Sequence, residues 1–486
     1  MYLKLGLLLL CMLGLTGSMG LFTPVAAIEH YDVVVVGAGA AGIAATRTLV
    51  DAGLSVLVLE ALDDYDGRIH TICWNATDDN GAHNNQAGCL DAGPMFVHHE
   101  YANVLIPTID ELGIDIQLFD QADSAVFDLR RYINPNRVGS DVGNTLDIVA
   151  EAEQYIAFGV SDAQTEQLAG YNFTDYKVET IQQFFFEQDY GNNLEYHEST
   201  DIDNRTDDQI GPDHVVPTGW RSIMKAIVER SPSIHPNMLF GSRVYEILYS
   251  ENITSGAAFV SYTRNGQNFT VRADVGVIVT PSINVIKSGM IDFIPDLPAS
   301  FMNSMNKIIC SEVDKVMLFF KEQNFPSDHK LDHNYIYRYS HVPNSRINDA
   351  LTCFVNWNHV YGHYAVSSFY QGDFARMMQN LTDQQIIAKH MAALKEIHPD
   401  FPCQPDSYHI SRNGKNPYFL CSYSTFGVGS THEDMAYLAT PLGYHNNLVF
   451  AGEAINTFPE DGTVNGAYGS GLAAAAHMIQ LHSSMN

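Results

Sequence analysis

The chain has 486 residues, of which 46% are hydrophobic, 11% aromatic and 17% charged, and this composition excludes a disordered, collagenous or coiled-coil protein. Its 56 acidic and 26 basic residues give a net charge of -30, which repels a nucleic-acid backbone and attracts a cationic ligand. Solubility alone is the alternative explanation of this charge. The length fits roughly two to four domains, or one large α/β protein with an interleaved second domain.

Residues 1–27 are predicted to be a secretory signal peptide. Lys4 precedes an uncharged, leucine-rich stretch that ends in the small-residue sequence Val25-Ala-Ala27, which is typical of a cleavage site. An uncleaved signal anchor is the alternative, because the stretch is just long enough to span a bilayer. No later segment offers about 20 apolar residues without charge, so we expect no other membrane span.

A strand, a helix and a second strand are predicted directly after this segment. Residues 31–36 and 54–59 are short apolar runs typical of strands buried on both faces, and residues 43–52 between them fit a helix. Glu60 ends the second strand. The three elements together form a βαβ unit.

The turn between the first strand and the helix contains Gly37, Gly39 and Gly42. In a dinucleotide-binding unit such glycines allow a tight turn, close backbone approach to a pyrophosphate, and close packing of helix on strand. The helix N-terminus attracts the anion, and an acid such as Glu60 accepts from a ribose hydroxyl. An ordinary glycine-rich turn is the alternative, and the unit alone does not distinguish NAD from FAD.

The rest of the chain gives weaker structural signals. Residues 101–219 are charged and weakly periodic, without a clear strand and with a mostly helical segment at 145–169. The other expected elements are strands at 257–263 and 275–280 around a turn at 264–266, strand material at 307–321 and 348–368, a helix at 382–397, and a strand, glycine-rich turn and helix within 447–478.

Cysteines and glycosylation sequons favour an oxidising, extracellular location. After signal cleavage six cysteines remain, and sequence alone does not choose their pairing; none has zinc-ligand spacing, so we expect no metal centre. The Asn-x-Ser/Thr sequons begin at Asn75, Asn172, Asn204, Asn252, Asn268 and Asn380. We therefore expect a secreted, N-glycosylated protein.

Two motifs near opposite ends of the chain resemble those of the flavin-containing amine oxidases. The segment from Glu60-Ala to Gly67-Arg68 resembles the Glu-Ala and Gly-Gly-Arg of that family, and residues 448–471 resemble its C-terminal flavin-binding signature. Within the family the polyamine oxidases look most similar. The resemblance implies FAD as the cofactor and a small cationic amine and O2 as substrates. The net negative charge adds the expectation of no nucleic-acid partner.

The resemblance also assigns cofactor contacts. Glu60 and Arg68 match the ribose and phosphate contacts, the Val244 backbone matches the adenine contact, and Glu453 matches the acid beside the ribityl chain; a local cap is the alternative for Glu453. The backbone of Thr463 and Val464 matches the donors to the flavin pyrimidine oxygens. The full predicted set is Gly37, Gly39, Gly42, Glu60, Arg68, Gly93, Met95, Phe96, Val244, Glu453, Thr463 and Val464.

Four residues are predicted to be catalytic. Alternation along residues 312–320 puts Lys315 on one strand face with Met317 and Phe319, and the family places a water-linked lysine beside flavin N5 there. An edge lysine that reaches solvent is the alternative. Tyr423 matches an aromatic wall of the substrate slot, His98 matches a residue that meets the substrate amine, and Glu195 falls near a substrate-side glutamate of some relatives; a surface or core histidine is the alternative for His98.

Several positions depart from the family pattern. Asp66 replaces the first glycine of Gly-Gly-Arg, a change expected to distort the phosphate loop, and Asn413 replaces a tryptophan. Thr463 stands where monoamine oxidases have an aromatic residue, which opens the slot for a slender polyamine. Cys421 replaces a glycine, and we expect a disulfide, with Cys403 or Cys353, rather than covalent attachment of the flavin.

The predicted fold is α/β, with a glutathione-reductase-like, Rossmann-type FAD domain and an interleaved α+β substrate domain. The FAD domain is expected to comprise residues 28–105, 220–300 and 405–486, and the substrate domain residues 106–219 and 301–404. The expected activity is oxidation of spermine- or spermidine-type amines by O2 to an aldehyde, an amine and hydrogen peroxide. A secreted L-amino-acid oxidase, a monoamine oxidase and an inactive flavoprotein that serves as a binding module are the alternatives.

Overall fold

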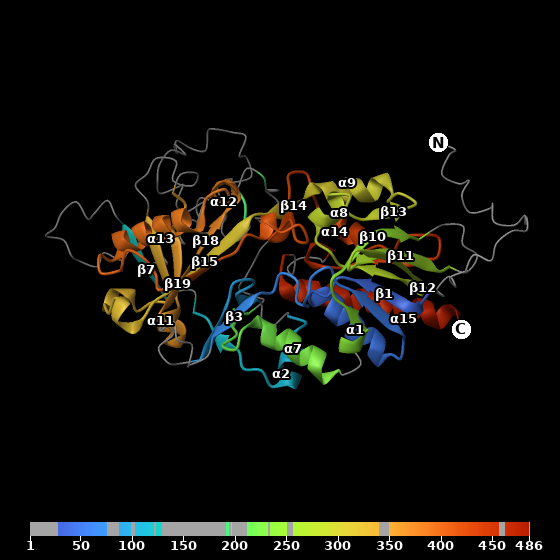
Figure 1. Ribbon diagram of the computed structural model, residues 1–486, viewed down its shortest axis with the longest axis horizontal. Helices are drawn as coiled ribbons and strands as arrows, with labels where there is room; N and C mark the ends of the chain where they lie inside the picture. Colours follow the sequence, from blue (N-terminus) through green and yellow to red (C-terminus); the bar gives the residue numbers. More distant parts are fainter. Residues whose placement is uncertain are drawn as a thin grey trace, which may run out of the picture.

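The structure is a computed structural model that describes residues 28–74, 87–98, 103–120, 123–128, 191–193, 196, 211–231, 234–249, 256–339, 349–455 and 462–485. The predicted signal peptide, the predicted helix at 145–169, Glu195 and the sequons at Asn75, Asn172, Asn204 and Asn252 lie outside these residues. The described elements gather into two bodies that lie side by side, each built around one sheet (Figure 1). Among the helices of the described ranges, none has the length and apolar character needed to cross a membrane.

The first body is built on a sheet of order β13-β10-β11-β12-β1-β2-β9, with β21 also paired to β12. Its strands are β1 (His30–Val36), β2 (Val56–Leu59), β9 (Met238–Leu239), β10 (Ser242–Leu248), β11 (Ala258–Arg264), β12 (Gln267–Val279), β13 (Asp292–Ile294) and β21 (Leu448–Phe450). The first half of the long strand β12 pairs with β11 in antiparallel fashion, and its second half lies parallel to both β1 and β21. Strand β12 therefore joins the βαβ unit to the C-terminal segment.

The central strand β1 is buried on both faces, as its unbroken valine run predicts. Val33 and Val35 belong to the core beneath α1, α7 and α15, whereas Val34 and Val36 belong to the core on the opposite face.

The helices of the described residues are α1 (Ala40–Asp51), α2 (Ile106–Leu112), α7 (Trp220–Arg230), α8 (Ile283–Lys287), α9 (Ala299–Lys307), α11 (Trp357–Tyr361), α12 (Gly372–Met378), α13 (Asp383–Ile397), α14 (His432–Leu438) and α15 (Val464–Met485). Short 3-10 turns lie at η6 (His235–Asn237), η7 (Glu322–Asn324), η8 (His329–Leu331), η9 (Asn413–Lys415) and η10 (Glu453–Ile455).

The second body contains a six-stranded sheet of order β19-β15-β18-β17-β16-β7. The strands are β7 (Ser124–Asp128), β15 (Val313–Phe319), β16 (Tyr335–Tyr339), β17 (Cys353–Asn356), β18 (Ala365–Gln371) and β19 (Ser407–Ile410). Val316 and Leu318 on β15 face the core shared with α12 and α13, whereas Met317 and Phe319 face a second core that includes Trp74, Leu90 and Val215. Helix α13 begins at the predicted position, where Thr382 and Gln385 form a capping box.

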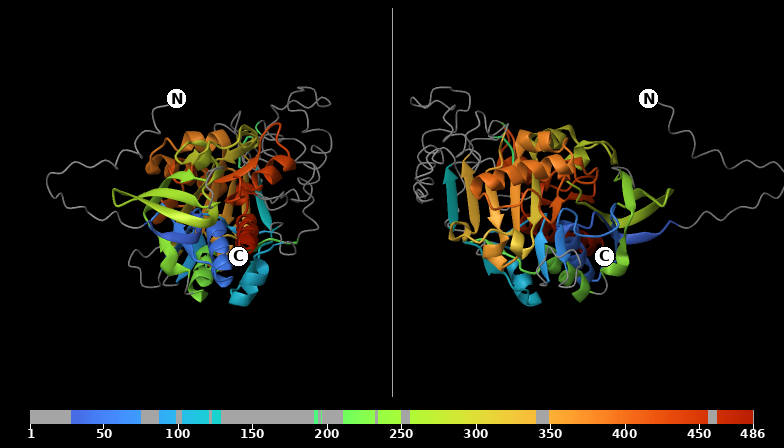
Figure 2. Two further views of the ribbon diagram at one scale, coloured as in Figure 1. Left: turned by 90° about the vertical axis from the view of Figure 1, so that its right-hand side faces the viewer. Right: turned by 60° about the vertical axis from the view of Figure 1, so that its left-hand side comes forward.

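Strand β7 corrects the expectation that residues 101–219 contain no clear strand. It pairs in parallel with β16 at the edge of the sheet, where the right-hand view of Figure 2 shows it in cyan. A five-residue edge strand offers too few positions for an alternating pattern to stand out in the sequence. Its partner lies more than 200 residues later, so no local hairpin signal identifies it either.

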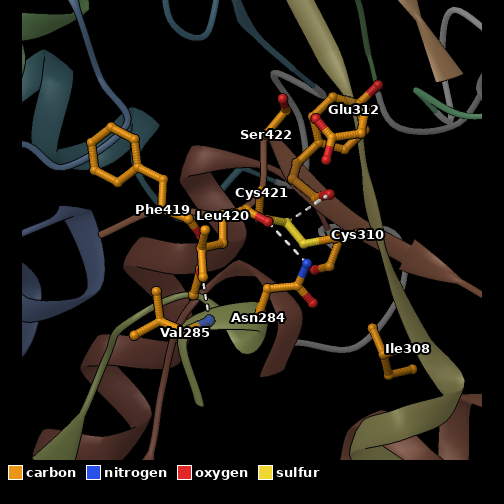
Figure 3. The surroundings of a disulfide bond; sticks show 12 residues. Asn284, Val285, Ile308, Cys310, Glu312, Phe419, Leu420, Cys421 and Ser422 are labelled. Carbon is orange, nitrogen blue, oxygen red and sulfur yellow. Dashed lines mark hydrogen bonds between the residues drawn. A yellow bond between two sulfur atoms is a disulfide. The ribbon is translucent and has the colours of Figure 1, made fainter. Parts of the chain in front are cut away.

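Three small sheets lie beside the two main ones, and two of them carry disulfides. Strands β3 (Thr71–Trp74) and β4 (Gly88–Asp91) are linked by Cys73–Cys89, and β14 (Ile308–Ser311) is linked by Cys310–Cys421 to the segment just before β20 (Tyr423–Phe426) (Figure 3). The third comprises β5 (Phe96–Val97), β8 (His214–Val215) and β6 (Gln117–Leu118).

The expected partner of Cys421 is therefore wrong. Cys421 pairs with Cys310 because the antiparallel pairing of β14 and β20 brings the two residues together. Cys353 is a buried thiol within β17, and Cys403 is exposed and unpaired. Sequence carries no direct signal for a strand pairing that joins residues 111 positions apart.

Candidate functional site

The glycine turn after β1 has the geometry of an anion cradle. Gly37 adopts a φ of +99°, and a Cβ on Gly42 would lie 2.0 Å from the carbonyl oxygen of Gly37, so both positions require glycine. Gly39 is the N-cap of α1 and offers no capping side chain. A Cβ on Gly39 would meet nothing within 4 Å, so the turn borders open space at the helix N-terminus. The residues present fit the pyrophosphate of a dinucleotide.

Glu60 fixes this turn to the end of β2. Its carboxylate is buried and accepts hydrogen bonds from the Ala38 N–H at 2.7 Å and the Leu62 N–H at 2.8 Å. Burial raises the pKa of Glu60, and the backbone donors oppose that shift. The Ser242 N–H donates to the Glu60 carbonyl, which brings β10 and the buried Val244 to the same edge of the sheet.

An ion pair joins the two motifs from opposite ends of the sequence. Arg68 Nη1 lies 2.8 Å from Glu453 Oε1 and also donates to the carbonyl of Ser422 at 3.1 Å. Glu453 is buried, and its other oxygen accepts from both the N–H and the hydroxyl of Ser424. The structure therefore brings Arg68 and Glu453 together, and the alternative of a merely local cap for Glu453 is wrong.

Asp66 keeps the backbone conformation that a glycine would adopt at this position. Its φ is +88°, its N–H donates to the carbonyl of Ala38 at 2.9 Å, and it forms a β-bridge with Gly39. The backbone contact between Asp66 and Gly39 is therefore intact, and the expected distortion of the phosphate loop is not seen there. The side chain is buried and lies 3.0 Å from Arg221 Nη1 on α7, and burial raises the pKa of Asp66 to about 7.

This raised pKa predicts a pH-dependent effect of Asp66→Asn. The folded protein binds the Asp66 proton more tightly than the unfolded chain, so the contribution to stability is present at low pH and lost as the pH rises towards 7. We expect Asp66→Asn nearly to match the wild type at pH 4 and to be more stable by about 4 kcal/mol at pH 8, measured by urea unfolding without cofactor. Asp64→Asn, which removes the exposed partner of the same arginine, is the control and should show no such pH dependence. A pH-independent difference for Asp66→Asn would contradict the assignment.

Lys315 is buried where β15 meets the segment from Asp91 to Gly93. Its side chain lies on the predicted face of β15, which pairs with both β18 and β19, so the edge-lysine alternative is wrong. The residue is 5% exposed, and Nζ donates to the carbonyls of Asp91 at 2.8 Å and Gly93 at 2.7 Å. Phe369 presents its ring 5.2 Å from the ammonium.

The buried carboxylate of Asp91 is the counter-charge of Lys315, and the sequence prediction missed it. Asp91 accepts from the hydroxyl of Thr71 at 2.5 Å and from the N–H of Trp220, the first residue of α7, at 3.0 Å. Burial raises the pKa of Asp91 and lowers that of Lys315, and each charge opposes the shift of the other. Asp91 lies four residues before Met95 in the stretch that carries the family resemblance, but nothing in that stretch indicated its partner.

Tyr423 lies beside the start of α15. A Cβ on Gly462 would be 3.3 Å from the Tyr423 ring, and a Cβ on Gly191 would be 2.5 Å from its hydroxyl, so the ring lies between these two glycines. Thr463 follows Gly462 and accepts a hydrogen bond from the Gly466 N–H at 3.0 Å. The predicted aromatic wall and the predicted N–H donors therefore come from adjoining elements.

His98 faces a second acid that the sequence analysis did not single out. Its Nδ1 lies 3.0 Å from Asp213 Oδ2, its carbonyl accepts from Asn103 at 2.7 Å, and its ring is 5.6 Å from that of Phe96. The side chain is partly exposed, as a residue that meets a substrate must be. Met95 is buried in the same segment. Glu195 lies outside the described residues.

Two histidines near Lys315 form a further cluster that the sequence analysis missed. The rings of His70 and His409 lie 5.0 Å apart, and Lys315 contributes to the low pKa of His409. Burial lowers the pKa of both, that of His409 to about 4. Both imidazoles are therefore neutral at physiological pH and add no positive charge beside the lysine.

The open space at Gly39 predicts opposite effects on stability and on nucleotide binding. Serine is a better N-cap than glycine, so we expect Gly39→Ser to leave the cofactor-free protein as stable as the wild type or slightly more stable. The added side chain fills the space that a pyrophosphate needs, so FAD should bind at least about tenfold more weakly. Fluorescence titration with FAD and thermal unfolding of the cofactor-free protein measure the two effects. Unchanged FAD affinity would show that the pyrophosphate does not approach Gly39.

Comparisons with known proteins agree with this arrangement. Residues 40–479 match the family described as flavin containing amine oxidoreductase. The chain is 28% identical to polyamine oxidase 5 of Oryza sativa subsp. japonica and 27% identical to polyamine oxidase 2 of Arabidopsis thaliana, in each case over 91% of this chain and 87% of the relative. A solved structure of a wild-type putrescine oxidase bound to putrescine superposes with a TM-score of 0.67 at 19% identity, covering 93% of this chain and 99% of the other.

Proposed function

The chain belongs to the family of flavin-containing amine oxidoreductases, and from that premise we propose that it is a secreted oxidase of polyamines such as spermine and spermidine. Family membership implies FAD as the cofactor and an amine and O2 as the substrates. One observation carries the proposal. The glycine turn, the Arg68–Glu453 pair and the start of α15 lie together, and the segment that Lys315 contacts adjoins them. The net charge of -30 favours a substrate with several ammonium groups.

The residues that would hold FAD are the glycine turn, Glu60, Arg68, Glu453 and the first residues of α15. When bound, FAD accepts a hydride from the carbon next to the reacting nitrogen, and O2 takes up the electrons to give hydrogen peroxide. The Tyr423 ring would orient the amine from one side of the slot. Lys315 would hold a proton at Nζ beside the cofactor, where the family places it, in a site from which water is largely excluded.

His98 is the candidate base for the substrate amine. The reacting nitrogen must be neutral, because an ammonium has no lone pair to assist hydride loss. With Nδ1–H donated to Asp213, Nε2 is the basic nitrogen of the neutral imidazole, and Asp213 stabilises the imidazolium that forms on proton uptake. The other ammonium groups of a polyamine stay charged and face the acidic protein.

The arginines support an amine rather than an amino acid as the substrate. An L-amino-acid oxidase needs an arginine that clamps the substrate carboxylate. Within the described ranges, Arg68 pairs with Glu453, Arg221 with Asp64 and Asp66, and Arg412 with Asp383. Arg68 is assigned to the FAD phosphate, and the guanidinium groups of Arg221 and Arg412 are already engaged by acids of the chain.

Secretion with N-glycosylation is part of the proposal and rests on three supports. The first is the predicted signal peptide, and the second is the pair of disulfides in the small sheets. The third is that the sequon residues Asn268 and Asn380, the two that lie within the described residues, are exposed. A loss of mass on enzymatic removal of N-glycans from protein collected in the medium would support it, and retention inside the cell would contradict it.

One experiment tests the activity directly. The purified holoprotein is mixed without oxygen with spermine, spermidine, a monoamine or leucine, and the flavin absorbance is recorded. We expect the two polyamines to bleach the flavin and the others to act much more slowly. Bleaching by leucine alone would favour an amino-acid oxidase, bleaching by the monoamine alone a monoamine oxidase, and a yellow protein that none of them bleaches a binding module.

A further inference from the structure

Asp66 places a buried carboxyl group beside the turn that fits the FAD pyrophosphate. Its backbone is paired with that of Gly39 in a parallel β-bridge, so the two Cα atoms lie at the spacing of neighbouring strands, about 5 Å. Gly67 packs on the same turn, since a Cβ there would be 3.4 Å from the Cα of Gly39. The Asp66 side chain is 0% exposed. When ionised, it is a fixed negative charge close to the place that an anionic ligand must occupy.

Arg221 of α7 is the counter-charge of Asp66. Its Nη1 lies 3.0 Å from Asp66 Oδ2, its Nη2 contacts the exposed carboxylate of Asp64, and its guanidinium stacks 5.0 Å from the Tyr65 ring. The guanidinium is therefore opposed by two carboxylates when Asp66 is ionised and by one when Asp66 is protonated. Loss or gain of this single proton changes the net charge beside the glycine turn.

Other titratable groups surround this pair and the turn, and they are common to the wild type and to variants of Asp66. They are Glu60, Asp64, Tyr65, His70, Asp91 and Glu229. The remaining charged side chain of the turn, Arg68, is paired with Glu453. A difference in pH dependence between the wild type and an Asp66 variant therefore reports on Asp66.

We propose that Asp66 and Arg221 form a proton-linked charge switch on cofactor binding, in which protonation of Asp66 strengthens the binding of the FAD pyrophosphate. This inference rests on the proposed FAD site and adds regulation of that site by pH. Burial raises the pKa of Asp66 to about 7 without ligand, and a bound anion nearby raises it further. By linkage, the anion then binds more tightly when Asp66 is protonated. Over roughly 10 Å at an effective dielectric constant of about 20 to 40, the expected change in affinity is about three- to tenfold.

The pH dependence of FAD affinity tests the switch. The purified holoprotein is diluted in series at pH 6 and pH 8.5, and the released FAD is measured by its fluorescence. Wild-type protein should bind FAD about three- to tenfold more weakly at pH 8.5 than at pH 6, whereas Asp66→Asn should lose this difference. Asp64→Asn is the control and should keep it, because Asp64 is the exposed partner of the same arginine. An equal pH dependence in the wild type and in Asp66→Asn would overturn the proposal.

Two further measurements keep the test decisive if Asp66→Asn does not fold. Asp66→Gly removes the same charge at a φ of +88°, which glycine adopts without strain, and should behave like Asp66→Asn. Calorimetric titration of the cofactor-free wild type with FAD at pH 7.5, in two buffers of different ionisation heat, should show an uptake of about 0.3 to 0.5 proton. Absence of proton uptake in the wild type would overturn the proposal without any variant.

A variant of the arginine tests the other half of the switch. Arg221→Gln should bind FAD at least about threefold more weakly than the wild type at pH 6, where the guanidinium is least neutralised. It should also show little pH dependence between pH 6 and pH 8.5, because an unpaired Asp66 stays protonated over this range. Wild-type affinity at pH 6 in this variant would exclude Arg221 from the switch.

The outcome is distinguishable from failure of the proposed activity. If the wild type binds FAD but no amine bleaches it, the polyamine oxidase proposal fails while the affinities at the two pH values still test Asp66. If amines bleach the flavin and the affinity of Asp66→Asn follows that of the wild type at both pH values, only the charge switch fails. If the wild type does not bind FAD, both are overturned.

Discussion

Replacing Lys315 by methionine is expected to lower the free energy of unfolding by about 3 to 5 kcal/mol. The change leaves Asp91 as a buried charge without its counter-charge, and it removes the donor to the carbonyls of Asp91 and Gly93. Without the lysine, the pKa of Asp91 rises further above that of the unfolded chain. The deficit should therefore grow as the pH rises above 7, because a raised carboxyl pKa stabilises the fold only while the group is protonated.

A double-mutant cycle measures the coupling between the two residues. Asp91→Asn, Lys315→Met and the double variant are unfolded with urea. The loss in free energy of unfolding for the double variant should be smaller than the sum of the two single losses by about 1.5 kcal/mol or more. Lys321→Met is the matched control. Lys321 lies just beyond the same strand, but its side chain is more exposed and its ion pair with Asp406 is long, at 4.0 Å. Its loss should stay below about 1 kcal/mol. Additive losses for Asp91 and Lys315 would contradict the buried-pair interpretation.

Removing the Cys310–Cys421 disulfide is expected to be the second large loss, about 4 to 5 kcal/mol for Cys310→Ala with Cys421→Ala. The bond closes a loop with a sequence separation of 111, whereas Cys73–Cys89 closes one of 16, for which the chain-entropy model gives about 3 kcal/mol. Thermal unfolding of the two double-alanine variants should therefore rank them in that order. Equal losses would show that loop entropy does not govern the difference.

The surroundings of this disulfide predict a local effect as well (Figure 3). Asn284 donates to the Leu420 carbonyl at 2.9 Å, and the Ser422 hydroxyl donates to the Val313 carbonyl at 2.7 Å, so the segment stays partly anchored without the bond. Tyr423 follows two residues after Cys421. We expect the double-alanine variant to retain FAD but to show a raised KM for the amine, because the aromatic wall is less firmly held.

The sequence predicted the elements whose signals are local. The unbroken valine run of β1, the glycine turn and the capping residue Thr382 each act within a few positions, and the corresponding elements lie where they were expected. Helix α1 begins at Ala40, three residues before the predicted start, since Gly42 lies inside the first turn rather than before it. The overall fold, a Rossmann-type FAD domain with an interleaved substrate domain, is confirmed by the family match and the structural likeness. The domain boundaries themselves stay predictions.

The features that the sequence did not predict depend on contacts between distant segments. Nothing near Lys315 indicates that Asp91, 224 positions earlier, supplies its counter-charge. The Cys310–Cys421 bond likewise follows from a strand pairing that alternation alone does not reveal. Asp66 shows the same limit in another way. The sequence reveals that an aspartate replaces the family's glycine, but not that Arg221 of α7 pairs with its buried side chain.

The Arg68–Glu453 contact has a consequence for how the enzyme is made. The arginine emerges from the ribosome well before its partner, which lies 385 positions later, and before helix α15. The nucleotide turn therefore has no complete pocket until these later residues have been synthesised, so cofactor loading has to wait for them. For a polypeptide exported during synthesis, FAD would have to be acquired on the far side of the export channel, and its supply in that compartment would limit the yield of active enzyme.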